Sequence, residues 1–388
     1  MKNHHLFSQP HQPFFVLAFV NAILSMFIFM LIFKGLVASE ILTLNYHAYS
    51  FIFLMFTPAF LAFLFTTFPR FSATEPIKKD HYLLIFRAFL GGSILFQVGT
   101  LFSTLLFTLG MLLTFVAHLG AGYILYNIYQ TSKMTEKEDQ AWILIAMLFG
   151  LLSHIIFIIS VWLPTLHTFA IEIAIYLYLF ILIFTVAQRM IPFFSHAPIE
   201  KHRERLKVII GLLGLHVLLE MIQNNSSFLV DFLLAYLIGK ELYRWKLPFP
   251  NPNPLLWILH IALYWIPLAF TIEGVTNIIT LSSGTNFLSI GIHALTLGFF
   301  LTVLIGFGTR VTLGHSGNMM HADRLTTTLF YWTQVVVFIR ILTSLAAANS
   351  WNFVVFFDLS ITVWVVLFAL WGNRFFPVLI FGKKLINK

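Results

Sequence analysis

The sequence predicts an all-α integral membrane protein in which residues 1–388 form one polytopic domain, a bundle of 12 transmembrane helices. Three observations support this prediction: 59% of the residues are hydrophobic, 10% are charged, and the mean hydropathy is +0.89. A soluble domain carries about a quarter charged residues, so this chain cannot cover a water-facing surface. Its apolar runs also lack the alternation of apolar and polar residues that is typical of the strands of an outer-membrane β-barrel. The composition therefore excludes a cytosolic enzyme, a secreted domain and a β-barrel.

Each helix is predicted from an apolar run of about 20 residues, the length that crosses a bilayer. The first run is too long, and too weakly basic at its start, to be a cleaved signal peptide. Short loops, many of them basic, separate the later runs. In chain order the predicted spans are 14–37, 47–68, 82–100, 102–129, 141–163, 167–189, 206–224, 226–243, 254–272, 287–309, 325–346 and 351–371.

The distribution of lysine and arginine predicts the orientation. The odd-numbered loops contain neither residue, and only Lys34 and Arg340 lie toward that side. Because positive residues mark cytoplasmic loops, both termini are predicted to be cytoplasmic. The net charge of +8 therefore belongs to short cytoplasmic loops, and no nucleic-acid partner is expected. The even-numbered loops and the C-terminal tail carry Arg70, Lys78, Lys79, Lys133, Lys137, Lys201, Arg203, Arg205, Lys207, Lys240, Arg244, Lys246, Arg310, Arg324, Arg374, Lys383, Lys384 and Lys388.

The chain contains no cysteine, which excludes disulfides, iron–sulfur clusters and covalently attached haem. A metal would have to be held by histidine, methionine, tyrosine or carboxylates. Fifteen histidines are present, many of them in apolar runs, and this pattern favours redox chemistry. Histidine is the natural ligand for haem iron and for copper.

Ionisable residues within the spans are costly and by default mark function. Counting 1.5 Å per residue sorts them by depth. His118, His154 and His216 fall near the midplane, His260 in the inner third, and His315 just beyond the inner end of the tenth span. The outer third holds His47, Glu172, Asp231, His293, Arg340 and Asp358.

This outer group suits a cofactor near the outer face. His47 and His293 have the similar depth that two axial haem ligands require. Arg340 could bind a haem propionate, or instead form an ion pair with Asp358. His216 and Glu220 are four residues apart on one helical face, which predicts either a structural hydrogen bond or a proton relay.

Residues 293–317 read HALTLGFFLTVLIGFGTRVTLGHSG. This segment resembles the signature of the NnrS family, a span that begins HA-L-T-x-G and ends R-V-x-L-G-H-[ST]-G. The resemblance covers nearly the whole chain and implies a twelve-span layout. Further matches follow in family order: residues 12–15 for R-P-F-F, 46–48 for W-H-A-H-E, 152–154 for a histidine motif of span five, 189–195 for R-V-I-P-F-F-T, and 259–260 with Trp265 for L-H…W.

The resemblance implies a haem- and copper-containing protein of the bacterial inner membrane that acts in nitric oxide metabolism, linked to denitrification and nitrosative stress. Its haem would be held non-covalently by histidine. The histidines carried over as metal ligands are His47, His154, His260, His293 and His315, and His315 is alternatively a structural cap. His118 and His216 match no family motif and are therefore expected less as ligands.

The chain departs from the family pattern at three positions. Tyr49 stands where the family has the second histidine of W-H-A-H-E, Ser50 stands for its glutamate, and Gln12 for the arginine of R-P-F-F. Tyrosine can itself ligate a metal. Copper binding is therefore a candidate property, and Tyr49 could replace the missing ligand or mark its loss.

The leading functional hypothesis is a haem protein, with copper as a candidate second metal, that binds or reduces nitric oxide. If it is an enzyme, it is an oxidoreductase of the nitric oxide reductase type. Its electrons would come from quinol or a cytochrome. One alternative is a protein that handles or transports copper or haem for metalloenzyme assembly, and another is a non-catalytic nitric oxide sink or sensor. The candidate proton carriers are Glu172, Glu220, Asp231 and Asp358.

Overall fold

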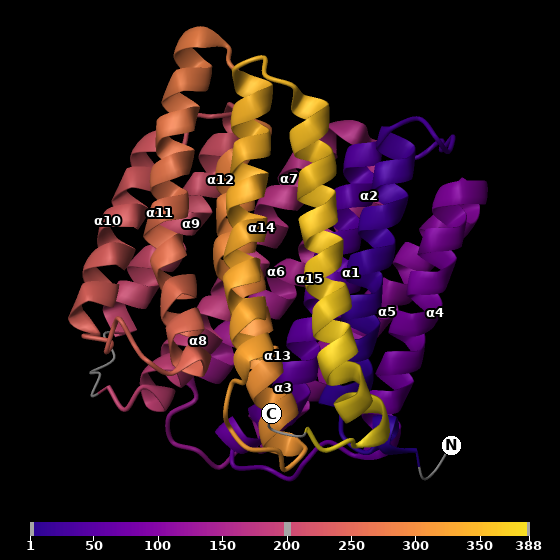
Figure 1. The fold of residues 1–388 in the computed structure, drawn as a ribbon, viewed down its shortest axis with the longest axis vertical. Helices are drawn as coiled ribbons and strands as arrows, with labels where there is room; N and C mark the ends of the chain where they lie inside the picture. Colours follow the sequence, from indigo (N-terminus) through magenta and orange to yellow (C-terminus); the bar gives the residue numbers. More distant parts are fainter. Residues whose placement is uncertain (1–3, 198–202, 386–388) are drawn as a thin grey trace. The chain divides into compact units, whose positions relative to one another are not determined.

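The computed structural model describes residues 4–197 and 203–385, and in these ranges all regular secondary structure is helical (Figure 1). Every predicted span corresponds to one continuous helical run, which confirms the all-α prediction. Lys201 and Lys388 of the predicted basic loops lie outside the described residues. The runs are α1 (His11–Phe33), Thr43–Phe71, α4 (Lys79–Phe102), α5 (Thr104–Thr131), α6 (Glu138–Ser160), Pro164–Phe194, α9 (Arg203–Ile222), α10 (Phe228–Arg244), α11 (Pro254–Ser283), Ile290–His315, α14 (Arg324–Ala348) and α15 (Phe353–Phe381).

Ten of these runs are long and apolar enough to cross a membrane, so the chain is a multi-pass membrane protein. The other two are α9 and α10. α9 begins with the polar segment RERLK, and α10 is only 17 residues long and contains four charged residues. At 1.5 Å per residue α10 is about 26 Å long, slightly short of a bilayer core of about 30 Å. These two helices are therefore the weakest of the predicted spans.

The helix ends at 43, 194 and 315 differ from the predicted 47, 189 and 309 by more than one turn, and so do the ends of α1, α11 and α15. α1 ends four residues earlier than the predicted 37, whereas α11 and α15 extend well past 272 and 371. Hydropathy measures the apolar length of a run, but the hydrogen-bonded length continues until the backbone changes conformation. The ends of α1, α11 and α15 are each followed closely by a glycine in the left-handed region, which stops a helix without steric cost. These are Gly35, Gly284 and Gly382, with φ of +69°, +72° and +66°.

Three runs contain a π-helical segment, in which the hydrogen bonds close over one more residue than in an α-helix. Their apolar windows are 100%, 89% and 89% buried, against 61% or less in the other seven candidate spans. The same three runs carry the predicted site residues His47, Glu172 and His293 shortly before the π segment. The segments are α2 (Thr43–Tyr49), η2 (Ser50–Phe56) and α3 (Thr57–Phe71); α7 (His167–Glu172), η4 (Ile173–Phe180) and α8 (Ile181–Phe194); α12 (Ile290–Leu295), η5 (Thr296–Leu301) and α13 (Thr302–His315).

The described chain forms two compact units. Unit 1 holds residues 4–174, 308–320 and 368–385, and unit 2 holds 175–197, 203–307 and 321–367. In unit 1, α4 and α5 form a tight hairpin joined through Ser103 alone, and they lie side by side in Figure 1. In unit 2, α10 packs along α11 and α12 packs against both α11 and α14. Each unit contributes its own group of buried polar side chains.

Candidate functional site

In unit 1, the departure residue Tyr49 contacts a predicted metal ligand directly. Its hydroxyl lies 2.6 Å from His154 Nε2 and 3.4 Å from the carbonyl oxygen of Met111. Tyr49 and His154 are both completely buried, on α2 and α6. Two segments singled out in the sequence, 46–50 and 152–154, therefore meet at one hydrogen bond.

His118 joins this cluster from α5. Its ring is fully buried, and its centroid lies 5.9 Å from that of His154. Phe53 stacks on His154 at 4.0 Å and contacts His118 at 6.0 Å, while Phe115 meets the His154 ring edge-on. We call Tyr49, Phe53, Phe115, His118 and His154 the midspan cluster. His118 belongs to no sequence motif, and its proximity to His154 arises from the packing of α5 against α6.

In unit 2, His293 is held by the backbone that precedes it. Its Nδ1 lies 2.8 Å from the carbonyl oxygen of Ser289. A carbonyl can only accept, so this shorter contact places the proton on Nδ1 and the lone pair of the neutral ring on Nε2; in that tautomer the guanidinium of Arg340, 3.2 Å from Nδ1, is not a hydrogen-bond donor to it. Leu288 and Ser289 both have positive φ, +47° and +52°, a strained conformation for non-glycine residues that is typical of functional sites.

Arg340 stabilises this strained turn. Its Nη2 donates to the carbonyl oxygen of Leu288 at 3.2 Å and lies 3.2 Å from His293 Nδ1, and its Nη1 donates to Ser344 at 2.6 Å. None of these contacts is the ion pair with Asp358, which the sequence analysis gave as the alternative to a haem propionate. Arg340 thus places a positive charge beside a candidate haem ligand.

His47, the other predicted haem ligand, belongs to unit 1. Its half-buried ring packs between Phe29 and Phe51, with centroids 4.4 and 4.9 Å away. Ser50, which replaces the family's glutamate, donates to the backbone carbonyl of His47 at 3.0 Å. Since His47 and His293 belong to different units, a haem bound between them stays a prediction.

The two remaining ligand candidates each contact another motif segment. His260 is fully buried, and its Nε2 lies 2.7 Å from the hydroxyl of Ser195, the last residue of the segment 189–195. The ring of His315 lies 5.0 Å from that of His11, which is buried beside the segment 12–15. The sequence did not single out His11, because it stands in a histidine-rich N-terminus that looks solvated.

His216 and Asp231 form a buried pair in unit 2. His216 Nδ1 donates to Asp231 Oδ1 at 2.7 Å, and Oδ2 accepts from Ser227 at 2.8 Å and Asn277 at 3.2 Å. The expected His216–Glu220 hydrogen bond is wrong. Both oxygens of Glu220 instead accept from backbone amides of the loop that leads into α10. Asp231 and Glu220 therefore have structural partners.

The other two predicted proton carriers lie on helices of different burial. Glu172 is buried at the end of α7, directly before the π segment η4. Asp358 is half-buried near the start of α15.

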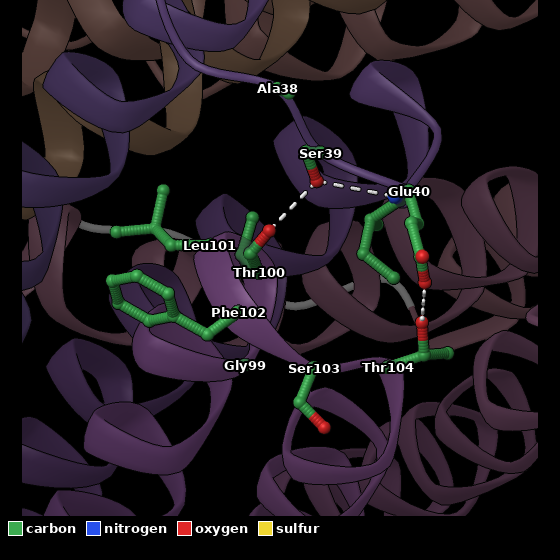
Figure 2. A pocket seen from close by; sticks show the side chains of 10 residues that line it. Ala38, Ser39, Glu40, Gly99, Thr100, Leu101, Phe102, Ser103 and Thr104 are labelled. Atoms are coloured by element: carbon green, nitrogen blue, oxygen red, sulfur yellow. Dashed lines mark hydrogen bonds between the residues drawn. The ribbon is translucent and has the colours of Figure 1, made fainter.

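A pocket of about 260 Å³ opens between residues 38–41 and 99–104 of unit 1 (Figure 2). The Ser39 hydroxyl donates to the carbonyl of Thr100 at 2.8 Å, and Thr104 donates to Glu40 at 3.0 Å. The pocket is smaller than a usual ligand site of about 300–1,000 Å³. Its hydroxyls and single carboxylate suit water or a small polar molecule rather than a metal.

These side chains fit the chemistry of a metal-binding membrane protein. A ligating histidine normally has its other ring nitrogen fixed by a carbonyl, carboxylate or hydroxyl. His293, His154 and His260 each have one ring nitrogen within hydrogen-bond distance of such a group. The residues therefore suit imidazole ligation of iron or copper.

Comparison with known protein families identifies the family of this chain. The model of the family described as NnrS protein matches residues 5–381 of the chain, and no curated protein matches it.

Proposed function

Because the chain belongs to the NnrS family, we propose that it is a haem protein of the bacterial inner membrane, with copper as a second metal, that binds or reduces nitric oxide. The coarser statement, a membrane protein related to nitric oxide, haem and copper, follows from family membership. The choice of ligands and the reaction are our proposal.

The fixed orientation of His293 carries the proposal. A haem ligand on a flexible ring would lose rotational freedom on binding, whereas the Ser289 carbonyl already fixes this ring with the lone pair on Nε2. Arg340, bonded to the same turn, supplies the cation that a haem propionate needs. His47 is proposed as a haem ligand within its own unit.

The chain's other residues would control access and protons. When bound, haem supplies an iron that coordinates nitric oxide and changes its oxidation state. Nitric oxide is small, neutral and lipid-soluble, so it can reach a buried site through the bilayer. Reducing two molecules to nitrous oxide and water consumes two electrons, from quinol or a cytochrome, and two protons. The proposed proton carriers are Glu172, Glu220, Asp231 and Asp358.

The test is an absorption spectrum of the detergent-purified protein, oxidised and then reduced with dithionite, before and after nitric oxide, with iron and copper measured on the same sample. We expect a sharp reduced haem band that shifts with nitric oxide. His293→Ala should abolish or shift this band. His81→Ala, at an exposed position at the start of α4, should leave it unchanged.

Two outcomes would overturn parts of this proposal. An unchanged spectrum and iron content in His293→Ala would remove His293 as a ligand. A folded wild-type protein without iron and without a haem band would remove the haem protein itself. Substoichiometric, exchangeable metal would then favour the handling of copper or haem for another metalloenzyme.

A further inference from the structure

A second pocket, of about 220 Å³, lies between α9 and α10 of unit 2, and none of its lining residues is a candidate metal ligand. The two helices are neighbours joined by a short loop, so the start of α9 and the end of α10 lie at the same end. The distribution of lysine and arginine predicts that this end faces the cytoplasm. The lining consists of three charged residues, which we call the rim, and three apolar ones: Glu204, Arg205 and Lys240, and Val208, Ile209 and Leu237.

Arg205 is held at the rim by a carboxylate of the facing helix. Glu241, whose side chain is 9% exposed, accepts from Nη1 of Arg205 and, at 2.9 Å, from Nη1 of Arg244. Its other oxygen accepts from the indole nitrogen of Trp245 at 3.1 Å. A guanidinium has five N–H groups, and this ion pair uses one nitrogen of Arg205. The remaining N–H groups belong to a side chain that is 41% exposed, so they can bind an anion in the planar geometry that suits phosphate.

Lys240 adds a second cation from α10. Its Nζ lies 5.6 Å from the centroid of the Tyr236 ring, and it forms no ion pair with a carboxylate within residues 4–197 and 203–385. The carboxylate of the rim, Glu204, is already paired with Lys207 at 2.8 Å. The rim therefore presents two cations, Arg205 and Lys240, from opposite walls of the pocket, and this charge favours an anionic ligand.

An exposed apolar groove continues from the pocket along both helices. On α9, Val208, Gly211 and Leu215 are spaced three and four residues apart and therefore share one face. Val208 is 52% exposed and Leu215 43%, and a Cβ added to Gly211 would meet no atom within 4 Å. On α10, Leu233 is 43% exposed and lies one turn before Leu237, which lines the pocket. The groove has the width and polarity that an acyl chain requires, next to a cationic rim.

We propose that this pocket binds one anionic glycerophospholipid of the phosphatidylglycerol type, with its phosphate on Arg205 and Lys240 and an acyl chain along Val208 and Leu237. Basic pockets between membrane helices on the cytoplasmic side recognise lipid head groups in this way. A soluble phosphate would leave the apolar groove unused, and a zwitterionic lipid would bring its ammonium group to two cations. The proposal goes beyond the proposed function, because no haem or metal ligand takes part. It gives α9 and α10, the weakest of the predicted spans, a lipid that holds them in the membrane.

The test is native mass spectrometry of the full-length protein, delipidated in a neutral detergent and titrated with phosphatidylglycerol or phosphatidylethanolamine. We expect one tightly bound phosphatidylglycerol per chain, and about fivefold or more weaker binding of phosphatidylethanolamine. Lys240→Gln should weaken the binding of phosphatidylglycerol about fivefold, the usual contribution of one basic residue near an anionic membrane surface. Lys240→Arg should retain it. Lys246→Gln is the matched control, since this exposed lysine lies two residues beyond the end of α10 and does not line the pocket.

A second pair of variants tests the groove. Val208→Trp places a large side chain in the pocket without changing its charge, and it should weaken the binding of phosphatidylglycerol about tenfold. Leu229→Trp makes a similar change at a position that is 70% exposed at the other end of α10, and it should bind the lipid as the wild type does. A ligand that binds only the folded state raises the melting temperature. Phosphatidylglycerol should therefore raise the melting temperature of the wild type and Leu229→Trp more than that of Val208→Trp.

Three results would overturn the lipid site. Equal weakening by Lys240→Gln and Lys246→Gln would mean that the lipid is attracted by the overall charge of this end and not by the rim. Equal affinity for the two lipids would remove the recognition of the anionic head group. Unchanged binding in Val208→Trp would remove the groove.

Discussion

At the residue scale, Asp231 shows how the fold accommodates a buried carboxylate within helix α10. It is 0% exposed and accepts hydrogen bonds from His216, Ser227 and Asn277. Every one of these partners is a donor. A buried charge is tolerated only when it is paired and hydrogen-bonded in this way.

We expect Asp231→Asn to destabilise the protein by about 2–4 kcal/mol, because the amide NH₂ group must face a donor and the charge opposite His216 is lost. Thermal or denaturant unfolding in detergent would measure this change. Asp80→Asn, at an exposed position in the first turn of α4, should cost less than about 1 kcal/mol. Equal stability of the two variants would mean that the cluster around Asp231 does not hold its helices together.

The sequence predicts which individual residues belong to the candidate site, but not which of them contact one another. Depth and motifs identified His154, His260 and His315. Their partners Tyr49, Ser195 and His11 became visible only when the helices were packed. A contact between residues 65 or 105 positions apart depends on how each helix is rotated about its own axis. Hydropathy gives no information about this rotation.

At the scale of elements, glycines set the closeness of α4 and α5. A Cβ added to Gly99 would lie 2.0 Å from the backbone nitrogen of Phe107, and one added to Gly110 would lie 2.4 Å from that of Phe96. Both are backbone collisions that no rotamer change relieves. Small residues at helix interfaces allow such close approach inside a membrane.

Gly110→Ala should therefore destabilise the protein by about 1–3 kcal/mol, the usual cost of overpacking. Gly211→Ala is the matched control, since nothing lies within 4 Å of its added Cβ on helix α9. That variant should gain about 0.5–1 kcal/mol from helix propensity. The free energy of unfolding of both variants is measured in the same detergent. If Gly110→Ala is as stable as the wild type, the hairpin tolerates a larger distance between α4 and α5.

The presence of each helix could be predicted from the sequence, whereas its π-helical segments could not. An apolar run of sufficient length must form hydrogen bonds within itself in lipid, so its helicity is dictated by composition. The π segments η2, η4 and η5 were not predictable, because their runs are buried on all sides and lack a polar face that would reveal the helical period. They occur in the second, sixth and tenth helical runs, at an interval of four.

At the scale of the whole molecule, the asymmetry of lysine and arginine predicts which ends face the cytoplasm. The absence of cysteine makes this testable, since a single introduced thiol has no background. A membrane-impermeant maleimide should label Ser282→Cys, exposed at the end of α11, in intact cells. Glu75→Cys, exposed before α4, should react only after the cells are opened. The reverse pattern would place His293 and Arg340 toward the cytoplasm.

The π segments also constrain how related sequences can gain or lose residues during evolution. Each wide turn accommodates an extra residue, so it can be understood as one inserted codon that the helix absorbed without breaking. Removing one residue from 296–301 would restore an α-helix and rotate everything downstream by about 100°, which would turn His315 away from His11. Relatives that gained or lost a codon within 50–56, 173–180 or 296–301 should therefore have exchanged the side chains that follow, whereas insertions in the loops should leave these helices unaltered.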